Sequence, residues 1–491
     1  MIFNRIFQRV KSHPYECLTG IAILIFLLFK VEDLLIPFHW DEMGVYAHAA
    51  FLMNDTHKIS LLPGSIDPYY SRGHPLLFTF CNSIVFRIFG ESVLAGHLFA
   101  LFISLATLVM FLLFARSIFN SKVAFFATTL LCIQPIFYSL AGQLLPEMML
   151  TLFTLGCFYG ILQHKWVMYA IFGSLAILTK ESAIIIPSTA LILVFTDSMR
   201  GRDFFTFQRW RIFLLAAVPL IVFGLFLIIQ RIQMGWFLFP LHTGYIHWKP
   251  DILLRDSGRI FRNLFLSQGR FVTGIPFLAG IVMILFAKSF GFVRERRILF
   301  VFLVYILLAF IFIDINYFLS RYLLFVIPFI VLGGTWITLT TLEKLFSATA
   351  PLKWVLILIF TGTGILLGHL NMYTSLNSCD MSYKYIVNAC LPAIQWAELN
   401  WKNETIEVNF PIYQGLEDPA NGYLKGKPIP YSVNFMAPTR YGLFFYFSKE
   451  EIVPSVKSHK YHIIKIFNDH YANVCAVEFE PPSLPPSIFH K

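Results

Sequence analysis

The sequence predicts a polytopic α-helical membrane protein that carries a small soluble domain at its C-terminal end. Of its 491 residues, 57% are hydrophobic, only 13% are charged and 54 are phenylalanine, more apolar surface than a soluble domain could bury. The apolar residues form long runs separated by short basic loops, which is the pattern of successive membrane helices. After about residue 371 the composition becomes polar.

Eleven apolar runs are candidate membrane spans. They lie at residues 17–37, 93–117, 122–140, 147–163, 166–180, 182–197, 211–231, 271–289, 297–314, 320–342 and 353–370. The loops that alternate onto one side are all basic, beginning with Arg5, Arg9 and Lys11, so the positive-inside rule makes that side cytoplasmic. Eleven crossings then place the C-terminus outside. We expect the first span to be retained, because no small-residue cleavage site follows it.

The outer loops contain further structure. Residues 41–54 and 76–90 are amphipathic or moderately apolar, and they are predicted as two interfacial helices in the first outer loop, above a cavity. The other long outer loop, residues 232–270, mixes aromatic and basic side chains, among them Trp236 and His242. That mixture suits either an interfacial belt or a lid over a phospholipid headgroup.

The tail is predicted to be a separate domain. Residues 1–370 would form the transmembrane catalytic domain, and residues 371–491 an extracytoplasmic soluble α/β domain. Short alternating segments in the tail are candidate strands, at 405–410, 461–467 and 473–478. Cys379, Cys390 and Cys475 could form a disulfide only if this domain is extracytoplasmic. No cysteine spacing indicates a metal site.

The net charge of +10 does not indicate a nucleic-acid partner. The basic residues are distributed among short loops between apolar runs instead of forming one patch. Such loops are typical of the cytoplasmic face of a membrane protein. Membrane lipids are therefore expected partners, and nucleic acids are not.

The unusual ionisable residues all fall on the outer side of this topology. They are Asp41, Glu42, Arg72, His74, Glu147, Lys180 and Arg321. Ionisable side chains at membrane depth are rare and mark chemistry or transport. Each one also has an ordinary explanation, as a helix cap, an interfacial anchor or half of an ion pair such as Lys180 with Glu147. Their coincidence on one side indicates a functional site.

Five short motifs follow one another along the chain: Asp41-Glu42, His74-Pro75-Leu76, Leu145-Pro146-Glu147, Leu178-Thr179-Lys180 and Ser320-Arg321-Tyr322-Leu323-Leu324. In this order they resemble the GT-C glycosyltransferases, especially the protein O-mannosyltransferase and bacterial aminoarabinose-to-lipid-A transferase branch. The resemblance covers residues 15–345 and leaves out the tail. It implies a fold of many spans with catalytic outer loops, and a sugar donor carried on a polyprenyl monophosphate.

The residue types suit the reaction that this resemblance implies. The cations that could hold the departing phosphate are Arg72, Lys180 and Arg321. Asp41, with Glu42 or Glu147 beside it, could take the proton of an acceptor hydroxyl. Direct displacement would invert the anomeric centre. No cofactor is required, although the three carboxylates could bind a divalent cation.

The chain departs from this family pattern at three points. Relatives often have Lys-Pro-Pro where this chain has Gly73-His74-Pro75, so the phosphate contact would pass to Arg72 or His74. Glu147 occupies an acidic position that is Asp in many relatives. The Trp-Trp-Asp-Tyr-Gly signature of oligosaccharyltransferases is absent, which counts against transfer of a preassembled glycan to Asn.

The predicted function is transfer of a single sugar from a polyprenyl-phosphate-sugar donor to a lipid, glycan or protein acceptor. The reaction would take place at the outer face of a bacterial inner membrane. A transporter or flippase of lipid-linked sugars is the main alternative, and it predicts ionisable groups on both sides of the midplane or two related halves. A non-enzymatic assembly or receptor protein ranks last, because the tail shows no evident site. The sugar and the acceptor stay open.

Overall fold

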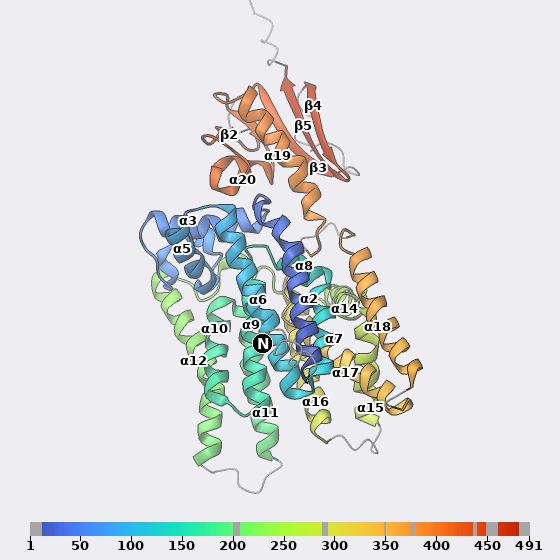
Figure 1. Ribbon diagram of the computed structural model, residues 1–491. Helices are drawn as coiled ribbons and strands as arrows, with labels where there is room; N and C mark the ends of the chain where they lie inside the picture. The colour runs from blue at the N-terminus through green and yellow to red at the C-terminus, as the bar shows by residue number, and fades with distance from the viewer. Residues whose placement is uncertain are drawn as a thin grey trace, which may run out of the picture.

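The computed structural model describes residues 12–199, 207–286, 293–347, 350–374, 379–435, 439–447 and 460–480. Within these ranges a long helical body carries a small sheet domain on one end (Figure 1). The α-helical body with a C-terminal sheet domain confirms the predicted fold class.

Helices occupy all eleven runs that the sequence predicts as spans. They are α2 (Pro14–Lys30), α6 (Val93–Ile118), α7 (Ser121–Cys132), α8 (Pro135–Leu140), α9 (Pro146–Leu162), α10 (Trp166–Thr179), α11 (Ile185–Met199), α12 (Phe207–Met234), α15 (Phe271–Phe286), α16 (Val293–Ile315), α17 (Ile327–Leu345) and α18 (Pro351–Leu370). Run 122–140 is divided into two helices, because Pro135 lacks the amide proton that a continuous helix needs. Among the described residues, four helices are long and apolar enough to cross a membrane: α6, α12, α16 and α18. The number of crossings stays a prediction.

Both segments predicted as interfacial helices are helical. The first is a short π-helical turn, η2 (Glu42–Ala47), that continues into α3 (His48–Asp55), and the second is α5 (Leu77–Phe89). A four-residue helix, α4 (Pro68–Ser71), lies between them. Met43, Ala47, Phe51 and Phe86 are buried, so these helices pack as a layer on the end of the body.

The second outer loop contains a helix that the sequence analysis missed. After α13 (Pro240–Thr243), α14 (Pro250–Phe265) buries Ile260 and Leu264 and exposes its basic residues. The spacing of four residues between these two buried side chains is the signal of an amphipathic helix. The sequence predicts only an interfacial belt or a lid for this loop, because its basic and aromatic residues obscure that spacing.

In the part of the chain that the structure describes, the sheet domain has five strands, in the order β2-β1-β3-β5-β4. Its elements are α19 (Tyr383–Asn400), β1 (Ile406–Val408), α20 (Ile412–Glu417), β2 (Tyr431–Ser432), β3 (Tyr441–Phe447), β4 (Tyr461–Asp469) and β5 (Ala472–Phe479). Strand β1 runs parallel to β2 and β3, whereas β5 is antiparallel to β3 and β4. All seven cysteines lie in the described residues and are unpaired. The possible disulfide among Cys379, Cys390 and Cys475 is therefore not formed in this structure.

Buried ion pairs and ring contacts join the sheet domain to the helical body. Asp33, which follows α2, pairs with Lys30 of that helix and with Lys384 of α19, the latter with an N–O distance of 2.5 Å. His39 stacks on Tyr383 at a ring-centroid distance of 5.7 Å. His39 is two residues before Asp41, so its contact with Tyr383 brings the start of α19 next to the segment that carries the first candidate site residue.

Candidate active site

Four charged side chains meet at the end of the helical body that carries the sheet domain. They are Asp41 before η2, Glu147 in the first turn of α9, Lys180 at the end of α10, and Arg321 in the 3-10 helix η5 (Ser320–Leu323). Each stands at the end of an apolar helix. The tertiary fold brings these four helix ends together, as the shared outer side predicted.

The four side chains form a chain of alternating charge. A guanidinium nitrogen of Arg321 donates a hydrogen bond to Asp41, and Arg321 Nε lies 3.4 Å from Glu147 Oε1. Lys180 Nζ donates to the same oxygen of Glu147 at 2.9 Å. It also lies 3.9 Å from the ring centroid of Tyr322, in a cation–π contact. Such pairing offsets the cost of removing the charges from water.

The two carboxylates of this chain have different exposure. Glu147 is 1% exposed, whereas 42% of the Asp41 side chain is accessible. Burial raises the pKa of Asp41, but the charge and the hydrogen bond of Arg321 outweigh this and lower it below its ordinary value. Asp41 is therefore ionised at neutral pH and open to a second reactant, while Glu147 is enclosed by the two cations.

The backbone before Asp41 is held in an unusual conformation. Trp40 has a φ of 46°, in the left-handed region that residues with a side chain rarely adopt. Its ring stacks on His39 with centroids 4.8 Å apart, and packs against Phe410 of the sheet domain at 5.7 Å. A conformation of this kind costs roughly 1–3 kcal/mol. The ring contacts hold it and thereby fix the position of Asp41.

Glu42 lies in a different network from Asp41. Its carboxylate accepts hydrogen bonds from the backbone N–H groups of His39, at 3.0 Å, and Leu144, and it lies 3.3 Å from His97 Nε2. Glu42 is 1% exposed. The structure therefore does not bring Glu42 to the charged cluster, although it is the sequence neighbour of Asp41. Its contacts tie η2 to α6 and to the segment before α9.

The remaining two predicted cations lie beside the cluster. Arg72 has a φ of 51°, and its guanidinium lies 5.1 Å from the ring centroid of Tyr69. Its buried Nε has no hydrogen-bond partner among the described residues. The Arg72 charge also lowers the pKa of Asp41, although by less than the charges of Arg321 and Lys180 do. His74 does not contact the cluster and pairs with Glu181, with 2.8 Å between Nδ1 and Oε2.

Three residues near the site were not predicted to be catalytic or phosphate-binding: Tyr322, Glu181, which the sequence offered only as an ion-pair partner of Lys180, and His242, which it offered only as part of a belt or lid. Two of them directly follow Arg321 and Lys180, and this adjacency was the available signal. His242 comes from the second outer loop, and its ring centroid lies 5.0 Å from that of His74. Burial, with the nearby charge of His74, lowers the pKa of His242 to about 4, so it is neutral at pH 7.

The three carboxylates considered for a cation, Asp41, Glu42 and Glu147, do not converge. In the part of the chain that the structure describes, the one group of three possible metal ligands is His74, Glu181 and His242. The divalent-cation alternative for the carboxylates is therefore not supported by their geometry, because Glu42 faces away and Arg321 separates Asp41 from Glu147.

The second outer loop reaches the site. Gly73 has a φ of 70°, and a Cβ atom there would lie 2.6 Å from Cβ of Phe239 and 3.2 Å from the Trp236 ring. Only glycine fits this position. The loop therefore packs on the segment that carries His74, as a lid would, while contact with a lipid headgroup stays a prediction.

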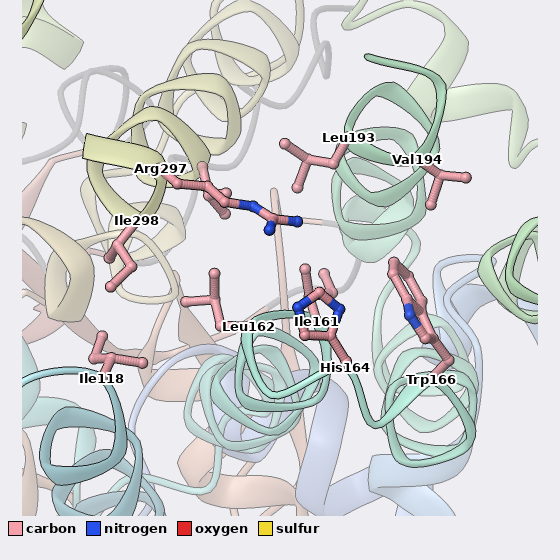
Figure 2. A pocket seen from close by; sticks show the side chains of 10 residues that line it. Ile118, Ile161, Leu162, His164, Trp166, Leu193, Val194, Arg297 and Ile298 are labelled. Atoms are coloured by element: carbon pink, nitrogen blue, oxygen red, sulfur yellow. The ribbon is translucent and has the colours of Figure 1, made fainter. Parts of the chain in front are cut away.

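A cavity of about 290 Å³ lies at the other end of the helical body (Figure 2). Its lining includes Leu162 at the end of α9, about 23 Å along the helix from Glu147. His164 and Arg297 point into it among apolar side chains, and none of the described residues that line it is a carboxylate. The described lining offers one imidazole and one guanidinium but not the paired cations and carboxylates of the charged cluster, so this cavity does not match the chemistry that the cluster offers.

Comparisons with known proteins agree with this architecture. Residues 73–229 match the family model described as dolichyl-phosphate-mannose-protein mannosyltransferase. The crystal structure of ArnT from Cupriavidus metallidurans bound to undecaprenyl phosphate is similar over 93% of this chain and 97% of that chain, with 13% identity and a TM-score of 0.59. The chain has the fold of the GT-C glycosyltransferases. The resemblance stated from the five motifs is therefore confirmed.

A second GT-C structure is similar over much of the chain. The Archaeoglobus fulgidus oligosaccharyltransferase in complex with Zn and sulfate matches over 87% of this chain and 67% of that chain, with 13% identity and a TM-score of 0.53. AglB from the same organism, with an inhibitory peptide and a dolichol-phosphate, matches over 89% and 70%, with 12% identity and a TM-score of 0.51. No curated protein sequence matches the chain. Within the GT-C fold, the matched family segment contains His74, Glu147 and Lys180.

Proposed function

We propose that this protein is an integral membrane glycosyltransferase that moves a single sugar from a polyprenyl-phosphate donor to a hydroxyl group of a lipid, glycan or protein acceptor. The observation that carries the proposal is the alternating chain Asp41–Arg321–Glu147–Lys180, with Asp41 accessible at its end. The polyprenyl-phosphate ligands of two GT-C neighbours support the donor class.

Lys180 and Arg321 are proposed to bind the donor phosphate. Both are nearly buried cations at helix ends, where Coulomb attraction to an anion is stronger than in water. Glu147 contacts both, so it holds the two cations in one place and is itself too enclosed to meet an acceptor. Arg72, with an unsatisfied buried Nε, could provide a third phosphate contact.

Asp41 is proposed as the general base. The acceptor oxygen attacks the anomeric carbon while its proton passes to Asp41. The bond from the anomeric carbon to the phosphate oxygen breaks, and its electron pair leaves with the polyprenyl phosphate, whose charge Lys180 and Arg321 stabilise. This single displacement inverts the anomeric centre.

Donor binding would also prepare the base. Arg321 lowers the Asp41 pKa in the structure, so Asp41 is a weak base while they are paired. A phosphate that binds Arg321 would neutralise its charge and compete for its hydrogen bonds. The pKa of Asp41 would then rise, because burial is the largest influence left. The base would therefore be strongest when a donor is present.

Transfer with inversion is the expected result of a direct assay. The purified full-length protein, mixed with membrane acceptors and synthetic polyprenyl-phosphate sugars, should release polyprenyl phosphate in step with the labelled product. Product with retained anomeric configuration would contradict direct displacement. Turnover of polyprenyl-pyrophosphate glycans but of no monophosphate sugar would contradict the donor class. A flippase would move the lipid-linked sugar without releasing polyprenyl phosphate.

The site is proposed to face the extracytoplasmic side of a bacterial inner membrane, because the loops on the opposite side are basic. A reporter active only in the cytoplasm should give no signal when fused after Lys491, and a strong signal when inserted after Gly201, in a predicted inner loop. The reverse pattern would show that the site faces the cytoplasm.

A further inference from the structure

Three possible metal ligands converge next to Lys180. One ligand atom each from His74, Glu181 and His242 lies within 4.8 Å of the other two. His74 Nδ1 and Glu181 Oε2 are already 2.8 Å apart, and the two imidazole rings have centroids 5.0 Å apart. The three residues come from separate segments of the chain, so this convergence is a property of the fold.

We propose that His74, Glu181 and His242 bind a divalent transition-metal ion, with zinc as the best match. Two imidazoles and one carboxylate are a ligand set that zinc favours, whereas magnesium and calcium prefer oxygen ligands alone. Tetrahedral zinc with bonds of about 2.0–2.1 Å needs donor atoms about 3.3 Å apart. Small side-chain rotations would bring all three into this range.

The surrounding backbone fixes two of the three ligands. His74 follows two consecutive residues with positive φ, Arg72 at 51° and Gly73 at 70°, which turn the chain back toward η4 (Glu181–Ile184). Glu181 is the first residue of η4 and directly follows Lys180. None of the three is fully buried: 18% of the His74 side chain and 30% of the Glu181 side chain are accessible. A bound ion would therefore keep a coordination position open.

This open position would bind an oxygen of the donor phosphate, a role that rests on the function proposed above. A divalent ion with Glu181 and two neutral imidazoles carries one net positive charge. That charge would lie beside Lys180, because the Lys180 ammonium group interacts electrostatically with both Glu181 and His242. The ion would also tie His242 of the second outer loop to the first, so that the loop covers the donor once metal is bound.

Metal content of the purified full-length protein tests the site. After chelation and incubation with zinc, gel filtration followed by elemental analysis should give one zinc ion per chain. His242→Gln and His74→Gln should each lose most of this zinc. His247→Gln is the matched control, because His247 lies in the same loop outside the ligand group. Equal zinc content in the wild type and both ligand variants, with unchanged gel-filtration profiles, would overturn the proposal.

Cobalt gives a second readout that does not depend on activity. Co²⁺ in the wild-type site should show visible d–d absorption that zinc abolishes by competition, and His242→Gln should lack this absorption. A spectrum of hexaaqua cobalt alone in the wild type would overturn the site. His74 and Glu181 would then form only an ion pair that joins two loops.

Binding of tritiated undecaprenyl phosphate tests the role of the ion. Removal of zinc should weaken binding about tenfold, equivalent to about 1.4 kcal/mol, and added zinc should restore it. Unchanged phosphate binding in a protein that binds zinc would overturn the phosphate role. If zinc binds and undecaprenyl phosphate never does, the metal site stands and the proposed donor class fails.

Discussion

Asp41→Asn should abolish sugar transfer, with a loss on the order of 100-fold or more, because the amide cannot accept a proton from the acceptor. The substitution preserves size and can still accept a hydrogen bond from Arg321. Protein level and binding of undecaprenyl phosphate should therefore stay close to those of the wild type. Initial rates of transfer at saturating donor would measure the loss.

Glu42→Gln is the matched control for this variant. Glu42 is the adjacent carboxylate, but its hydrogen bonds come from the backbone N–H groups of His39 and Leu144 and it contacts His97, none of which belongs to the charged cluster. Replacing one of its oxygens by an NH₂ group should destabilise the protein by about 1–3 kcal/mol. Transfer per folded molecule should change little. Near-normal transfer by Asp41→Asn together with an inactive, folded Glu42→Gln would contradict our choice of the base.

Lys180→Met should reduce use of the donor, with kcat/KM for the donor falling by about tenfold to 100-fold as one charged phosphate contact is lost. Methionine is unbranched and nearly as long as lysine, but it has neither the charge nor the Nζ atom that lies over the Tyr322 ring. Lys165→Met is the matched control, because Lys165 also lies over a tyrosine ring, at the opposite end of α10.

A double variant separates the loss of donor binding from the loss of stability. Lys180→Met alone leaves Glu147 with one cation, and breaking a buried pair typically costs about 3–5 kcal/mol. Lys180→Met combined with Glu147→Gln removes both charges, so thermal stability should recover while donor use stays low. Recovery of donor use in the double variant would show that Lys180 acts only through stability.

The positions of the helices could be predicted from local sequence. An apolar run inside a membrane is expected to be helical. The lipid offers no hydrogen-bond partners, so the backbone N–H and C=O groups must bond to one another within the segment. That requirement is local, and it gave helices at all eleven runs and in the first outer loop. The same reasoning did not predict α14, because this helix has a strongly basic exposed face and only a narrow stripe of apolar residues.

The sequence also placed the candidate charges on one side but could not determine their partners. Asp41 and Arg321 are 280 residues apart in sequence and form a hydrogen bond, whereas Asp41 and Glu42 are adjacent and belong to separate networks. Likewise, His74 meets Glu181 across 107 residues. The sequence by itself determined the positions of the apolar helices and the helix ends that carry the charged residues. Both depend on hydrophobicity and helix length, which are properties of a single segment. Only the tertiary structure decided which charges pair. A buried charge needs a partner of opposite charge, and here that partner comes from a helix that is distant in the sequence.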